Sequence, residues 1–181
     1  SVLQTEVYID SYSSGFICFA PQFFMDDRSF TALQLTVLPS NKSWDFTFEF
    51  DDYSHVDYEK SGRVIIDGSF ITGDSKVVQA SISMNDMFMD SVALSSAFFM
   101  NESLAEKIKN TSKVLSPYIF SNEIYFSTDF SSFSFNSPFF IIANTQKEGE
   151  LLTFALDGSN QTISLSNLDL QFGNQTAHAV A

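Results

Sequence analysis

The chain has 181 residues and a mass of 20.3 kDa, which fits one domain and excludes a β/α barrel or a two-domain dehydrogenase. Hydrophobic residues make up 44% of it, enough to form a core, so the chain is not intrinsically disordered. The net charge of −13 and the pI near 4.2 disfavour binding to nucleic acid or to anionic membrane surfaces, because both repel a negative protein.

The first segment, residues 2–10, alternates between apolar and polar residues. Leu3, Thr5, Val7 and Ile9 fall on one face of an extended strand. The pattern is that of a strand and not of the apolar core of a signal peptide, so none is expected in this sequence. An exposed strand of this kind can pair with the sheet edge of a neighbouring copy. We therefore predict that residues 2–10 are a self-association strand, which can be exchanged with a neighbouring subunit.

The clearest strand runs from Trp44 to Asp51. Four large apolar side chains alternate along it with three acids and a threonine. This pattern is typical of a sheet with one wet face and one dry face. We expect the face carrying Trp44 and the phenylalanines to be buried.

Further strands are predicted wherever short apolar runs stand between turn residues. These runs are Leu33–Leu38, Val64–Ile66, Val78–Met84, Ile124–Phe126, Phe139–Ala143, Leu151–Leu156, Thr162–Leu165 and Leu168–Phe172. Turn signals separate them at Pro39–Asn41, Asp67–Gly68, Gly73–Asp74 and Asp157–Asn160.

One helix interrupts the strands. Ser103 and Glu106 form a capping-box pattern, and Leu104, Ala105 and Ile108 give the segment a short apolar stripe. The sequence therefore predicts one mostly-β domain over residues 1–181, an antiparallel two-sheet sandwich of jelly-roll or immunoglobulin type, with one short helix near residues 103–110.

Phenylalanine is the main core-forming residue, with 21 copies in the chain. Neighbouring pairs such as Phe23 with Phe24 and Phe139 with Phe140 must point to opposite faces of a strand. The second face at these pairs is either covered by the helix or a loop, or it is a hydrophobic contact surface for another chain.

Catalytic motifs are absent from the sequence. The single cysteine, Cys18, lies in an apolar strand context and excludes an intramolecular disulfide or a cysteine-ligated cluster. Of the two histidines, His178 lies close to the last residue, and neither a nucleophile elbow nor a phosphate-binding glycine loop occurs. We predict no catalytic residues and no enzyme, with a hydrolase as the weakest of the alternatives.

One polar cluster could hold a cation. In an extended segment, His55, Asp57 and Glu59 fall on the same face at two-residue spacing. Calcium is the cation that such carboxylates favour over zinc. The solvated face of an edge strand has the same pattern, so the alternative to a calcium site is a strand face that binds no cofactor.

Five asparagines stand in the N-x-Ser/Thr pattern that accepts N-linked glycans: Asn41, Asn101, Asn110, Asn160 and Asn174. Serine and asparagine also occur together in ordinary turns. The pattern favours a secreted or cell-surface glycoprotein.

Two functional classes remain open. The first is a secreted or surface-exposed structural or adhesive subunit, for instance of a filament, which self-assembles or binds another macromolecule. Its partners would be further copies of the chain, with no nucleic acid and no membrane insertion. The second is a soluble extracellular or periplasmic module that binds carbohydrate or calcium, in which Trp44 or the tyrosines form a platform. The acidic charge suits both classes.

Overall fold

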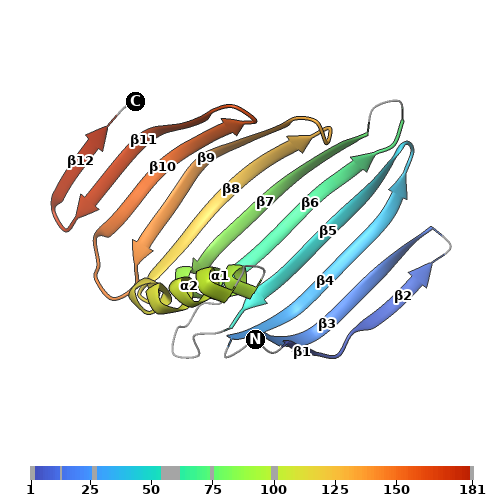
Figure 1. Ribbon diagram of the computed structural model, residues 1–181, viewed down its shortest axis with the longest axis horizontal. Helices are drawn as coiled ribbons and strands as arrows, with labels where there is room; N and C mark the ends of the chain where they lie inside the picture. The colour runs from blue at the N-terminus through green and yellow to red at the C-terminus, as the bar shows by residue number, and fades with distance from the viewer. Residues whose placement is uncertain are drawn as a thin grey trace.

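The computed structural model describes residues 3–12, 14–25, 28–53, 62–73, 76–98 and 102–179. These residues form one open antiparallel sheet of twelve strands, in which nearly every strand pairs with the next one along the chain (Figure 1). The sheet begins at an edge formed by β1 and β2, which both pair with β3, and ends at β12. The prediction of a mostly-β antiparallel fold is confirmed.

The strand bounds are as follows: β1 Leu3–Thr5, β2 Tyr8–Tyr12, β3 Gly15–Met25, β4 Arg28–Ser40, β5 Ser43–Asp52, β6 Gly62–Ile71, β7 Val77–Phe88, β8 Tyr118–Thr128, β9 Phe133–Asn144, β10 Glu150–Ser159, β11 Ile163–Phe172 and β12 Gln175–Ala179.

The described residues form a single sheet and not the two layered sheets that the sequence pattern predicted. Alternation requires that one face of a strand be shielded from water, but it does not require that the shield come from the same chain. The described part of this chain supplies only a small cover, which consists of two helices at one end of the sheet (Figure 1).

These helices are α1, Met89–Phe98, and α2, Glu102–Leu115, where one helix near residues 103–110 was expected. The helix α2 is amphipathic, as its sequence indicated, whereas α1 concentrates no apolar residues on one side. The two helices pack against each other, and α1 also contacts β7 and β8.

The strand registers sort the side chains into two faces. Residues opposite each other on neighbouring strands point to the same side of the sheet. We define the apolar face by three rows of paired residues. The first row is Phe16, Val37, Phe46, Gly68, Ala80, Phe126, Phe135, Gly158 and Ile163, the second is Cys18, Leu35, Phe48, Ile66, Ile82 and Ile124, and the third is Pro39, Trp44, Phe70, Val78, Thr128 and Phe133. The opposite side is the polar face.

Full burial occurs mainly at the end of the apolar face that carries the helices. Asp52, Val64 and Asn122 lie on the apolar side there, and all three are buried. Arg63 directly precedes Val64 in β6 but lies on the polar face, where its side chain is 51% exposed. The helices therefore cover the apolar face and not the polar one.

A second buried group lies on β3 and β4, where Phe23 and Phe30 stack with ring centroids 4.7 Å apart. The ring of Phe50 meets Phe30 edge-on at 5.6 Å. This is offset and T-shaped aromatic packing of the kind found in protein cores.

Gly68 lies in the middle of β6, although the sequence suggested a turn at Asp67–Gly68. A Cβ atom at Gly68 would come within 2.5 Å of Phe46 Cζ and 2.6 Å of the Gln79 backbone oxygen. Glycine is required here because the ring of Phe46 fills the space that a side chain would need.

We expect the substitution Gly68→Ala to lower the free energy of unfolding by about 1–3 kcal/mol, because a backbone oxygen must move to admit the methyl group. The matched control is Gly73→Ala, since no atom lies within 4 Å of a Cβ there. Urea unfolding of both variants measures the difference, and equal stability of the two would contradict the packing assigned to Gly68.

Candidate functional site

The apolar face is largely uncovered. None of the residues in its three rows is buried. Trp44 is 43% exposed and Ile163 is 74% exposed. The expectation that the Trp44 face of β5 is buried is therefore wrong, because Trp44 is exposed and Phe46, Phe48 and Phe50 are only half-buried. A contiguous exposed surface of this kind marks a contact site in soluble proteins.

No charged side chain occurs in the three rows of the apolar face. An acid on the same side of the sheet, Asp52, lies at the end that the helices cover, where it is buried. A partner that packs on the uncovered part of the apolar face would gain free energy from dispersion contacts and from the burial of apolar surface. It would not have to remove water from a charged group.

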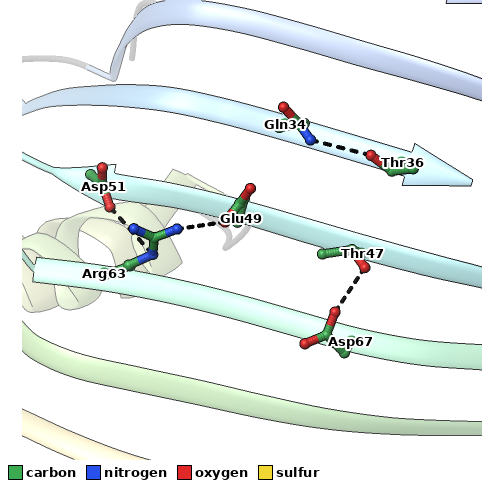
Figure 2. A network of polar contacts seen from close by, with 7 residues as sticks. All are labelled: Gln34, Thr36, Thr47, Glu49, Asp51, Arg63 and Asp67. Atoms are coloured by element: carbon green, nitrogen blue, oxygen red, sulfur yellow. Dashed lines mark hydrogen bonds and ion pairs between the residues drawn. The ribbon is translucent and has the colours of Figure 1, made fainter.

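The polar face carries a network of charged and hydroxyl side chains across β4, β5 and β6 (Figure 2). Arg63 donates from an Nη atom to Glu49 at 2.7 Å, and its Nε lies 3.9 Å from Asp51. Thr47 donates to Asp67 at 2.7 Å. The hydrogen bond that Arg63 donates to Glu49, together with the negative charge of Asp51, raises the pKa of Arg63.

We expect Arg63→Ala to cost less than about 1 kcal/mol of stability, because the ion pair is open to solvent. Its arginine side chain is 51% exposed and that of Glu49 is 28% exposed. Thermal or urea unfolding of Arg63→Ala, Glu49→Ala and the double variant isolates the pair energy. A coupling energy of several kcal/mol between Arg63 and Glu49 would show that this network, and not the apolar face, supplies the main stability of the sheet.

A shallow hollow of about 620 Å³ crosses β6, β7, β8 and β9. Its walls are polar-face side chains, while the backbone of one apolar-face row forms its floor. The wall residues are Asp67, Ser69, Gln79, Ser81, Tyr125, Ser127, Ser134 and Asn136. The hollow therefore lies on the side opposite the apolar face.

Tyr125 is the aromatic member of these walls and is largely exposed. Its hydroxyl donates to Glu123 at 2.7 Å, and this hydrogen bond raises the pKa of Tyr125. The serine hydroxyls of the walls are small and hydrophilic, so the hollow can hydrogen-bond a polar molecule.

The β8–β9 turn forms one rim of the uncovered apolar face. Asp129 accepts hydrogen bonds from the hydroxyl and backbone N–H groups of Ser131 and Ser132. These bonds hold the pKa of Asp129 well below its usual range, and the bond from the Ser131 hydroxyl has the largest effect. In the same turn Phe130 meets the ring of Phe70 edge-on at 6.3 Å. The turn thus extends the apolar surface beyond the strand ends.

The predicted cation site at His55, Asp57 and Glu59 lies outside the residues that the structure describes, so it stays a prediction. Within the described ranges, no three histidine, cysteine, aspartate or glutamate side chains come together as a metal-binding group. Cys18 is a free, half-buried thiol on the apolar face.

The predicted self-association strand is divided in the structure. Leu3 and Thr5 belong to β1, Ile9 belongs to β2, and Val7 lies between the two strands. Both strands pair with β3 of their own chain. Val7 and Ile9 are 51% and 71% exposed. Exchange of this segment between copies stays a prediction.

Four of the acceptor asparagines are described, and all are exposed: Asn41, Asn110, Asn160 and Asn174. The side chain of Asn160 accepts a hydrogen bond from the Phe133 backbone N–H and donates one to the Ser131 backbone oxygen. It therefore ties the β8–β9 turn to the end of β10. Asn101 lies outside the described residues.

No family model, no curated protein and no solved structure matches this chain. Among the described segments, no helix has the length and apolar character needed to cross a membrane. The two faces of the sheet are therefore the features of the molecule that bear on its function.

Proposed function

We propose that this protein is a secreted or cell-surface structural subunit without enzymatic activity, which works by packing the apolar face of its sheet against another protein surface. The observation that carries the proposal is the uncovered apolar face, in which no residue of three long rows is buried. Free exposure of such a surface in water is unfavourable at about 25 cal/mol per Å². A partner that covers the face recovers this free energy.

A protein partner fits the face better than a small apolar ligand. The first row of apolar residues runs across nine strands, β3 to β11. At about 4.8 Å per strand this is roughly 40 Å, much wider than one acyl chain. The hollow described above lies on the polar side, away from this face.

A sheet from another chain would complete the architecture that the sequence pattern predicted. Two sheets packed face to face, about 10 Å apart, form the sandwich core of many extracellular domains. In the proposed assembly the second layer of the sandwich comes from the partner and not from this chain. The exposed acceptor asparagines Asn41, Asn110, Asn160 and Asn174 support the proposed location outside the cell.

Two measurements test the proposal: the binding of an apolar fluorescent dye, and the mass of the native protein by mass spectrometry. We expect either an assembly that excludes the dye or a monomer that binds it strongly, because the apolar face is covered in the first case and free in the second. A monomer that excludes the dye would contradict the proposal. So would protein from its natural source that retains a stoichiometric lipid.

The polar hollow favours a second function, binding of a neutral carbohydrate. Its walls combine the exposed ring of Tyr125, on which a sugar can stack, with serine hydroxyls and the amide of Gln79. The carboxylate of Asp67 would accept hydrogen bonds from sugar hydroxyls and would repel acidic sugars.

A screen of neutral and acidic oligosaccharides tests this second function. We expect neutral sugars to bind and Tyr125→Ala to weaken binding at least tenfold, with Tyr125→Phe as the matched control that keeps the ring. The absence of any binding, or binding that both variants leave unchanged, would exclude the hollow as a sugar site.

A further inference from the structure

We infer that the partner of the apolar face is a second copy of this chain, packed face to face about a two-fold axis, with the helix pairs at opposite ends of the dimer. This inference rests on the proposed function and names its partner. In such an isologous interface the same surface of both copies is buried.

The size of the uncovered face suits a stable dimer. Its first row crosses nine strands, and three rows two residues apart cover about 15 Å along the strands. The second and third rows cross six strands each, so the mean width of the three rows is about 30 Å and their flat area is roughly 450 Å². Side-chain relief increases the accessible area toward the ~800 Å² per partner that stable complexes bury.

The charge distribution permits two such acidic copies to meet. Each copy carries a net charge of −13, but the three rows of the apolar face contain no charged residue. In a face-to-face dimer the two polar faces point outward, roughly 20 Å apart when both sheets and their outer side chains are counted. This separation exceeds the ~8 Å Debye length at physiological salt, so the outward acids of the two copies are screened from one another.

The size of the helix pair allows the apolar faces of two copies to pack against each other. A helix is about 10–12 Å in diameter, close to the ~10 Å spacing between packed sheets. Figure 1 shows the helices at one end of the sheet. In the proposed dimer, α1 and α2 of one copy would therefore lie in the same layer as the sheet of the other copy. They would lie beyond the end of that sheet and would limit sliding of the two copies. The helices cover only one end of each face (Figure 1), so a two-fold axis that lies between the sheets and runs across the strands places the two helix pairs at opposite ends of the dimer.

Cysteine cross-linking along β7 tests the inference. In a Cys18→Ser background, single cysteines replace Val78, Ala80 or Ile82 on the apolar face, and Gln79, Ser81 or Ser83 on the polar face. A bismaleimide reagent of about 10 Å span matches the distance between packed sheets. We expect cross-linked dimers from the apolar-face positions and at least tenfold less from the polar-face positions, so that the yield alternates along the strand.

The unmodified protein gives a readout that needs no substitution. Cys18 lies on the apolar face, so we expect its alkylation to be at least tenfold slower at concentrations where the dimer forms than after dilution to monomer. Circular dichroism of each variant shows whether the sheet is retained.

The results that would contradict a second copy as partner differ from those that would contradict the proposed function. A monomer at all concentrations that binds the apolar dye and whose cysteines never cross-link would overturn the second copy as partner and leave the proposed function standing. An assembly in which apolar-face and polar-face cysteines cross-link equally would overturn both. A dimer in which Cys18 reacts as fast as in the monomer would overturn the face-to-face arrangement.

Discussion

Replacement of Ile82 by lysine should dissociate the assembly. Ile82 lies in the middle of β7 on the apolar face, opposite Ile66 on one side and Ile124 on the other. A lysine there would be buried in the interface without a partner, which costs several kcal/mol for each copy. We expect the dissociation constant to rise by at least about 100-fold, since each 1.4 kcal/mol is a factor of ten.

The matched control is Ser83→Lys, because Ser83 is the next residue along β7 and lies on the polar face. It adds the same charge on the same strand and should leave the dissociation constant within about twofold. Sedimentation velocity over a range of concentrations measures both variants. Equal dissociation by the two lysines would show that the added charge, and not the apolar face, controls assembly.

Phe30→Ala should cause the largest loss of stability within a single chain. Phe30 is 2% exposed, stacks on Phe23 and receives the edge of Phe50. Removal of a buried phenylalanine ring costs about 3–5 kcal/mol through lost transfer energy and the cavity left behind. For a domain of this size that is a large part of the total stability.

Phe139→Ala is the control for this variant, because Phe139 pairs with Glu123 on the polar side and is 37% exposed. We expect it to cost less than about 1.5 kcal/mol, since much of its ring already contacts water. Urea unfolding at a fixed protein concentration compares the two variants. A similar loss for both would mean that the cluster around Phe30 is not the core of the chain.

The strands could be predicted from the sequence because period-two alternation depends only on local geometry. The segment from Trp44 to Asp51 shows this well, since its apolar and acidic residues lie on opposite faces as expected. The neighbouring pair Phe23 and Phe24 also separates, with the first ring buried and the second exposed. These outcomes follow from the direction of successive Cβ atoms along a strand.

The arrangement of the strands could not be predicted in the same way. Alternation has the same appearance whether the covering layer is a second sheet of the same chain, a helix or another molecule. The helix α1 was missed because its apolar residues have no helical period, and its place is set by contacts with α2 and β7. The sequence predicts a turn at Gly68, because it does not reveal that the ring of Phe46 covers this residue.

The candidate site was foreseen only in part. The acids of β5 lie on the polar face as predicted, whereas the apolar face of this strand was expected to be buried. A hydrophobic contact surface was one of two interpretations of the phenylalanine pairs. The exposure of Trp44 was not anticipated, because a lone tryptophan in an alternating strand is usually part of a core. The polar hollow gave no local signal, since its walls come from four separate strands.

The most direct test of the central claim is the mass of the purified protein in solution, measured by light scattering over a wide range of concentrations. We predict an assembly with twice the 20.3 kDa chain mass or a multiple of that value, which dissociates on dilution while Trp44 emission shifts to longer wavelength. A monomer at every concentration, with Trp44 emission unchanged and no binding of an apolar dye, would contradict the claim that the apolar face is a protein contact surface.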